Sequence, residues 1–378
     1  MFRPFPLDDK LLLFDRDTGA NRLIEGGPAE GMRQVAPRVL QVSLTNACNK
    51  QCAFCYRPLD AKSQWTFDDM LELARVASEW GVLEFAFGGG EPTIFPRFAE
   101  LVRRIWDETE ICPNFTTNGL RLSREMLREM RGAYGQIQLS VYDEDDTEAI
   151  IARLVDEDAR FGLNYLVTPD RAATLERDLI EFMTLGVRDV LLLSYKGHDA
   201  RMHLSPTQMA ALDATLARIY PVLAPRMALK VDVCWGGRLS LTPRLFETGD
   251  CGAGRLFCSV SSDRRLLACS FGDKVHGAVD EGPRPSSRTR SVRESEGGPD
   301  SAPPSWGEGS EEPSRRESFG DEHRASGLPI ERLEDLPRLW ESLRDAAPAA
   351  DAPGCARLPE FGLSFVPASH LIRPQPRP

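Results

Sequence analysis

Residues 48–55 read Cys-Asn-Lys-Gln-Cys-Ala-Phe-Cys and place three thiols at a C-x3-C-x2-C spacing. An apolar run at 39–44 precedes them, so the cysteines are expected in a loop that follows a strand. Thiolates this close in sequence can converge on one metal centre. Three thiolates leave one iron of an iron-sulfur cubane without a protein ligand. The stretch therefore predicts a cluster with an open iron.

A structural zinc site is one alternative for these thiols, and three unrelated buried cysteines are another. Structural zinc takes four ligands, commonly from paired C-x2-C units. No fourth Cys or His lies near the three in sequence. The spacing favours an iron-sulfur cluster but does not decide the matter alone.

Length and charge limit the class of protein. The 378 residues suffice for one barrel-sized domain and a smaller module. No apolar run approaches the roughly 20 residues needed to span a bilayer, and the first residues lack the apolar core of a signal peptide. We therefore expect a cytoplasmic protein with no membrane partner. The net charge of −11 argues against nucleic acid as the main partner. Nine cysteines in such a chain indicate metal ligands or buried thiols rather than disulfides.

From residue 38 to about 195, short β-type runs alternate with amphipathic stretches, the pattern of parallel βα units. Capping boxes at 66–69 and 205–208 mark two helix starts. The fold class is α/β, a partial (β/α)6 barrel of the TIM type with its chemistry at the C-terminal strand ends. Strands are predicted at 39–45, 82–88, 111–117, 136–142, 163–168 and 188–194, and helices at 66–80, 96–108, 123–132, 144–160 and 172–185.

The composition divides the chain into four parts. An N-terminal β-hairpin, predicted within residues 10–25, caps the main fold. A seventh strand at 227–234 is expected to lead out of the barrel towards a hairpin at 251–269, and residues 328–343 suggest an amphipathic helix. Gly, Pro, Ser, Glu and Arg dominate the stretch 275–327, which is expected to be disordered because it offers little apolar surface. The expected domains are 1–37 for the cap, 38–225 for the barrel, 226–274 with 328–378 for a small C-terminal module, and 275–327 for the insertion.

Three of the predicted strands end in motifs of small and polar residues. The second strand ends in Phe-Gly-Gly-Gly-Glu-Pro-Thr at 87–93, where glycines can expose backbone groups to a ligand. The third ends in Thr-Thr-Asn-Gly at 116–119 and the fourth in Leu-Ser-Val-Tyr-Asp at 139–143. Each motif alone is also a plain turn signal or a solvated hydroxyl. Their succession along consecutive strand ends indicates a ligand site.

The cysteine spacing together with these motifs resembles the radical S-adenosylmethionine (SAM) enzymes over residues 38 to about 195. The resemblance implies a [4Fe-4S] cluster on Cys48, Cys52 and Cys55. It also implies a SAM pocket lined by Phe54, Gly89, Gly90, Glu91, Pro92, Asn118 and Ser140. The longer Arg-Gly segment after the fourth strand of peptide-modifying members is missing, so no basic contact to the SAM carboxylate is carried over. The acidic run at 143–146 is interpreted as a helix N-terminus favoured by the macrodipole.

The activity implied by the resemblance is reductive cleavage of SAM to a 5′-deoxyadenosyl radical, which abstracts hydrogen from a substrate. It also implies an external electron donor such as flavodoxin or ferredoxin. A ribosomally made peptide that becomes cross-linked or oxidised is the expected substrate, and a small molecule in cofactor or natural-product biosynthesis is the alternative. A non-catalytic iron-sulfur electron carrier or sensor is a third possibility, which the Gly-Gly-Glu-Pro strand end disfavours.

The C-terminal cysteines resemble the SPASM and twitch modules that hold an auxiliary iron-sulfur cluster. The resemblance implies one such cluster on Cys251, Cys269 and Cys355, with Cys258 or Cys234 as a fourth ligand or with a site left open. A degenerate module with merely buried thiols is the alternative. Cys112, on the third strand, is expected in the core.

Side chains after the sixth strand are candidates for proton transfer at the barrel mouth. These are Tyr195, Lys196, His198 and His203. The alternative is that they are simply solvated loop side chains, because only geometry can establish reach to a substrate.

Overall fold

The protein is described by a computed structural model that covers residues 1–55, 57, 62–197, 199–239, 241, 251–271 and 327–346. Almost the whole predicted insertion, the expected ligand Cys355 and His198 lie outside the described residues. No helix within the described part is long and apolar enough to cross a membrane.

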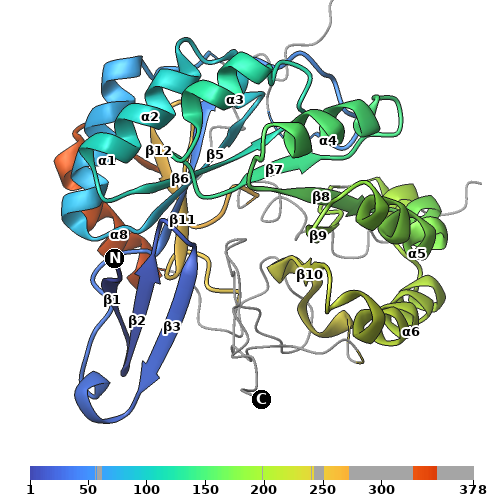
Figure 1. Cartoon of the computed structure of the whole chain (residues 1–378). Coiled ribbons are helices and arrows are strands. Elements are labelled where there is room, and N and C mark those ends of the chain that lie inside the picture. The colour runs from blue at the N-terminus through green and yellow to red at the C-terminus, as the bar shows by residue number, and fades with distance from the viewer. Residues whose placement is uncertain are drawn as a thin grey trace, which may run out of the picture.

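One ten-stranded sheet organises the described residues, with the strand order β10-β9-β8-β7-β6-β5-β4-β11-β12-β13 (Figure 1). From β10 to β11 every neighbouring pair is parallel, and β12 and β13 are antiparallel additions at one edge. The strands are β4 Val39–Thr45, β5 Glu84–Gly89, β6 Cys112–Thr117, β7 Ile137–Ser140, β8 Phe161–Val167, β9 Asp189–Ser194, β10 Ala228–Val231, β11 Phe257–Val260, β12 Arg265–Leu267 and β13 Leu328–Pro329.

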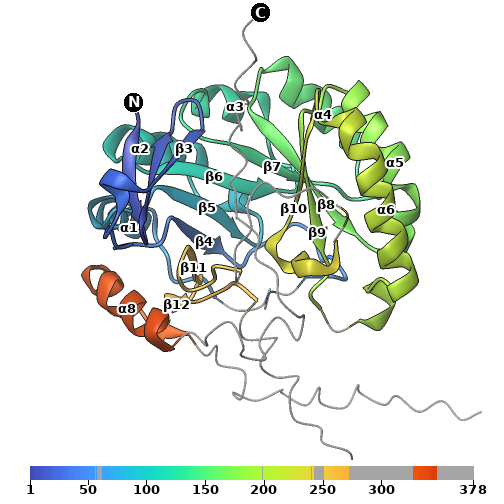
Figure 2. The same cartoon turned by 90° about the horizontal axis from the view of Figure 1, so that it is seen from below.

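Helices follow the parallel strands and lie on the outside of the curved sheet (Figure 2). The two predicted capping boxes are both present, at Thr66 with Asp69 and at Ser205 with Gln208. Among the described strands the sheet stays open between β10 and β13, so the predicted partial barrel is confirmed. The helices are α1 Phe67–Trp80, α2 Phe98–Glu108, α3 Arg124–Met130, α4 Thr147–Asp156, α5 Pro169–Thr184, α6 Pro206–Leu223 and α8 Leu336–Ala346.

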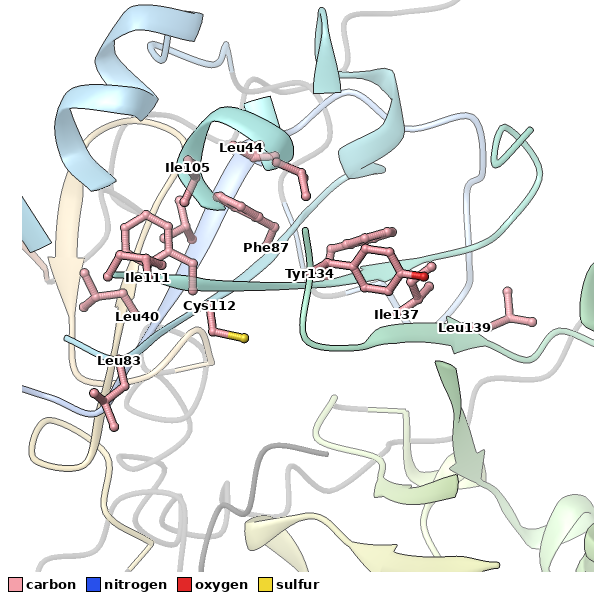
Figure 3. Close-up of a cluster of buried hydrophobic side chains, with 14 of the residues drawn as sticks. Leu40, Leu44, Leu83, Phe87, Ile105, Ile111, Cys112, Tyr134, Ile137 and Leu139 are labelled. Atoms are coloured by element: carbon pink, nitrogen blue, oxygen red, sulfur yellow. The ribbon is translucent and has the colours of Figure 1, made fainter. Parts of the chain in front are cut away.

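Alternation along the strands separates an apolar outer face from a polar inner face. Buried side chains such as Leu40, Phe87 and Leu139 belong to the core between sheet and helices (Figure 3). Cys112 is also buried among the core residues, at 2% exposure, as predicted. Their strand neighbours point the other way because successive side chains of a strand face opposite sides.

A small antiparallel sheet, β1 Arg3–Leu7, β2 Lys10–Asp15 and β3 Ala20–Glu25, lies beside the barrel. The hairpin β2–β3 was expected, but β1 was not, because Pro4 and Pro6 argue against a strand. Proline is tolerated there because β1 is an edge strand. The Arg3 guanidinium fastens this sheet to the barrel by donating to the backbone carbonyls of Ser78 and Val82, at 2.7 and 2.9 Å.

Two other expectations differ from the structure. The strand expected to leave the barrel is β10, which instead pairs in parallel with β9 and stays in the sheet. The amphipathic stretch expected to be helical from residue 328 starts with β13 and a turn, and α8 begins only at Leu336. Pro337 in the first helical turn favours that start, because proline is best tolerated in the first turn of a helix.

Candidate cofactor site at the strand ends

The cysteine loop leaves β4 at the C-terminal edge of the sheet. Cys48 and Cys52 are half-buried, Cys55 is exposed, and none is in a disulfide. A turn closes the loop, with the Cys55 amide donating to the Cys52 carbonyl at 3.0 Å. Burial raises the pKa of the Cys48 and Cys52 thiols. Within the described ranges, no three His, Cys, Asp or Glu side chains stand close enough to hold a metal ion as they are.

The end of β5 packs directly against this loop. The Gly90 amide donates to the Thr45 carbonyl at 2.6 Å, and the Glu91 amide donates to the Ala47 carbonyl at 2.9 Å. A Cβ at Gly90 would lie 2.0 Å from the Ala47 carbonyl oxygen, and one at Gly89 would lie 2.3 Å from that of Thr45. Gly89 also has φ of 122°, which side chains rarely adopt. Both glycines are therefore required by the close approach of two backbones.

The Glu91 carboxylate joins this strand end to the next one. It is 1% exposed and accepts four hydrogen bonds. The Thr93 amide and hydroxyl donate at 3.2 and 2.6 Å, the Thr117 hydroxyl at 2.7 Å and the Asn118 amide at 2.8 Å. A buried carboxylate needs such partners to offset its desolvation. Glu91 therefore fixes the geometry of the site from within the protein.

The ends of β6 and β7 close the ring of motifs around the cysteine loop. The Asn118 side-chain amide donates to Asn49 Oδ1, in the cysteine loop, at 2.8 Å. Phe54 stacks on Tyr142 with ring centroids 5.9 Å apart and an interplanar angle of 11°. Burial and the neighbouring Cys52 thiol raise the Tyr142 pKa, and the hydroxyl also shares a hydrogen bond with Ser140. The structure thus brings together the predicted residues from β4 to β7.

Lys50 supplies a contact that the sequence did not reveal. Its ammonium lies 2.9 Å from both Asp145 carboxylate oxygens and 3.0 Å from Glu144, and it stands over the Tyr142 ring at 4.3 Å. The acidic run was interpreted as a helix N-terminus, and Asp146 does cap α4. Its neighbours, however, anchor the cysteine loop. The only sequence signal was one lysine between the cysteines.

A second group of side chains lies at the ends of β9 and β10. Lys196 pairs with the Asp232 carboxylate at 2.5 Å, and Ser194 Oγ donates to the same carboxylate at 3.1 Å. Burial alone would lower the pKa of Lys196, but the Asp232 charge more than offsets this and the pKa is raised. Cys234 and Cys269 both act electrostatically on this ammonium, so the two thiols lie near it.

The remaining predicted ligands are divided between two sides of the sheet. Cys258 is fully buried on the helix-facing side of β11, within the apolar core. The backbone at Gly254, shortly after Cys251, lies beside the end of β12, because its amide donates to the Ala268 carbonyl at 3.1 Å. The turn of the predicted β11–β12 hairpin contains Arg264 in the left-handed region, with φ of 60°.

His203 is exposed and packs edge-on against Tyr195, with ring centroids 4.9 Å apart. Its Nε2 lies 2.8 Å from the Gly197 carbonyl oxygen. This contact holds the loop after β9 and needs no substrate to explain it.

The donor set fits an iron-sulfur cluster. Three reduced thiols share one loop, and thiolate is the ligand that these clusters require. The loop is held on two sides, by the glycine-lined β5 end and by the Lys50 ion pairs, while its thiols remain outside the apolar core. A metal would have to gather the thiols and displace their protons.

Comparison with known proteins agrees with this geometry. Residues 42–163 match the model of the Radical SAM superfamily. The chain is 32% identical over 225 residues to the PqqA peptide cyclase of Rhodopseudomonas palustris, covering 57% of this chain and 54% of that protein. It is 32% identical over 110 residues to the probable GTP 3′,8-cyclase of Methanocella arvoryzae, covering 28% of this chain and 35% of the relative.

Among solved structures, SuiB of Streptococcus suis shares the fold at 15% identity. The form bound to S-adenosylmethionine gives a TM-score of 0.53, covering 66% of this chain and 63% of SuiB. The form bound to the precursor peptide SuiA gives 0.54, covering 66% and 62%. Each of these matches leaves more than a third of the other protein's length uncovered. The similarity of this chain to the Radical SAM superfamily extends over residues 42–163.

Proposed function

We propose that the protein is a radical SAM enzyme that cleaves SAM reductively and uses the resulting radical on a substrate. The observation that carries the proposal is the junction of the cysteine loop with the Gly89-Gly90-Glu91 strand end, made by two backbone hydrogen bonds. A pure electron carrier has no need of a glycine-lined strand end beside its thiols. When bound, a [4Fe-4S] cluster and SAM supply a 5′-deoxyadenosyl radical that can abstract hydrogen.

The chain's own residues bind and orient these groups. Cys48, Cys52 and Cys55 would hold the cluster, and the backbone at Gly89 and Gly90 would face the amino-acid end of SAM. Because the Glu91 carboxylate is already saturated by four donors, its role is to hold that backbone in place. Four further residues at the loop and the neighbouring strand ends would complete the SAM pocket. They are Phe54, Pro92, Asn118 and Ser140.

A peptide is the proposed substrate. The PqqA peptide cyclase match spans more than half of this chain, and the SuiB fold has been solved with a precursor peptide. A small molecule is the second candidate, because probable GTP 3′,8-cyclases match 110 and 86 residues of this chain. An external one-electron donor such as flavodoxin or ferredoxin belongs to either version.

An auxiliary iron-sulfur cluster is part of the proposal. Cys234 and Cys269 both act electrostatically on Lys196, and the backbone at Gly254, shortly after Cys251, pairs with the end of β12. Cys258 is the weaker candidate for the fourth ligand, because its side chain lies in the apolar core on the other side of the sheet. Cys355 stays a predicted ligand outside the described residues.

Loss of one loop thiol tests the main proposal. We expect Cys52→Ala to reduce anaerobic formation of 5′-deoxyadenosine to background, because the cluster loses a ligand that nothing else in the loop replaces. The control is Cys112→Ala, which removes a buried thiol far from the loop and should retain cleavage. A Cys52→Ala protein that still cleaves SAM would falsify the assignment.

Glycine 90 offers a second test with a matched control. Gly90→Ala would force its Cβ against the Ala47 carbonyl, whereas Gly88→Ala places a Cβ where no atom lies within 4 Å. We expect the first variant to lose bound iron and SAM affinity, and the second to keep a near-normal melting temperature and iron content. Equal iron and SAM binding in the two variants would contradict the packing of the β5 end against the loop.

Iron analysis tests the auxiliary cluster. In a variant that lacks Cys48, Cys52 and Cys55 we expect about four iron atoms per chain after anaerobic reconstitution, the content of one cubane. Adding Cys269→Ala should remove them, and adding Cys258→Ala should not. Iron that disappears with the loop cysteines alone would show that the C-terminal module holds no cluster.

A further inference from the structure

The inner face of the barrel contains polar atoms that have no partner. Among the described residues, Gln138 Oε1 and Asn164 Oδ1 are shielded from solvent and accept no hydrogen bond. Asn164 as a whole is only 9% exposed. An unsatisfied buried polar group is costly, so native proteins rarely keep one without a reason. Two such carboxamides on neighbouring strands indicate a ligand that completes them.

Strand pairing places these groups in one surface. Asn164 pairs with Ser140 on one side and with Leu191 on the other, and Leu191 pairs with Lys230. Gln138 lies two residues before Ser140, on the same face of β7. We call these residues, Gln138, Asn164, Leu191 and Lys230, the inner-face row. It begins next to Ser140, a predicted SAM contact, and runs towards the open edge at β10.

The row has no net charge available for an anion. Its cation, Lys230, forms an ion pair with the Asp189 carboxylate of the neighbouring strand at 2.6 Å, so the two side chains together carry no net charge, although Lys230 Nζ and Asp189 Oδ1 are also buried without a hydrogen-bond partner. Leu191 is half-buried and stays apart from the main core. A polyphosphate would need cations that are not already paired. Carboxamides beside a leucine instead suit a peptide, whose uncharged backbone amides can hydrogen-bond to the carboxamides while an apolar side chain contacts the leucine.

We infer that the carboxamides of Gln138 and Asn164 form a substrate subsite that hydrogen-bonds backbone amides of a peptide. The inference rests on the proposed function for the identity of the ligand as a substrate. A side-chain carboxamide has both a donor and an acceptor, so it can pair with both groups of a peptide bond. The subsite would hold the peptide beside the SAM pocket, along the inner-face row.

Stability measurements test the free protein without any knowledge of the natural substrate. Replacement of a carboxamide that lacks partners by an apolar side chain of similar size removes a desolvation cost. We therefore expect Gln138→Leu and Asn164→Leu each to raise the melting temperature by about 1–3 °C.

The matched control is Asn114→Leu. Asn114 lies on the same face but is fully engaged, since it donates to Glu84 at 3.2 Å and accepts from the Gln136 amide at 2.9 Å. We expect this variant to lower the melting temperature. If the two test variants lose as much stability as Asn114→Leu, the carboxamides are structural and the inference is wrong.

Binding measurements test the ligand class. The probes are N-acetyl-Gly-Leu-Gly-amide, which is an uncharged capped tripeptide, and GTP, each titrated calorimetrically into the full chain. We expect the tripeptide to bind wild type more tightly than GTP, and the double variant to bind it about tenfold more weakly, the effect of losing one or two hydrogen bonds. Tighter binding of GTP, no saturable binding of the tripeptide, or an unchanged affinity in the double variant would each overturn the inference.

Formation of 5′-deoxyadenosine by wild type reports separately on the proposed function. Its absence would remove the radical SAM assignment and leave the binding result unaffected. Tripeptide binding that fails while SAM is cleaved would remove only the subsite.

Discussion

The buried Glu91 carboxylate is the interaction on which the site depends. A carboxylate at 1% exposure is stable only if its oxygens are satisfied, and here all donors come from its own turn and from the end of β6. The same residue donates its backbone amide to Ala47, at the start of the cysteine loop. One residue thus sets the relative positions of three neighbouring strand ends. The glycines before it follow from this packing, because a Cβ would collide with the loop backbone.

The curved sheet separates stability from chemistry. Its outer face buries apolar side chains against the helices, which is where most of the folding free energy arises. Its inner face contains carboxamides, hydroxyls and lysines. Each of these lysines is paired with a carboxylate, Lys196 with Asp232 and Lys230 with Asp189. In the part of the chain that the structure describes, the sheet does not close. Such an interior suits a neutral polar substrate held next to a redox centre.

Local patterns made much of this fold predictable. The barrel strands and the helices between them follow from short apolar runs and capping signals, as at Thr66 and Ser205. The strand-end motifs were found because they are contiguous in sequence. The sequence failed where tertiary context decides: β1 survives two prolines only because it is an edge strand, and β10 stays in the sheet because β9 offers it a parallel partner.

Contacts between distant residues were also beyond prediction. Nothing local indicates that Lys50 pairs with Asp145, or that Lys196 pairs with Asp232, because each pair joins different strand ends. The side chain of Cys258 faces the helices because Cys258 pairs with Leu40, and this register is known only from the pairing of β11 with β4. Which thiols can share a metal is therefore a question of sheet geometry more than of cysteine spacing.

The most direct measurement of the central claim is the electron paramagnetic resonance spectrum of the reduced, reconstituted protein before and after addition of SAM. If the loop thiols hold a cluster with an open iron beside Gly89 and Gly90, the g values should change clearly, because SAM would then be a ligand of that iron. The change should occur in a variant that lacks Cys251 and Cys269, where only the loop cluster can remain. A spectrum that SAM leaves unchanged would contradict the account.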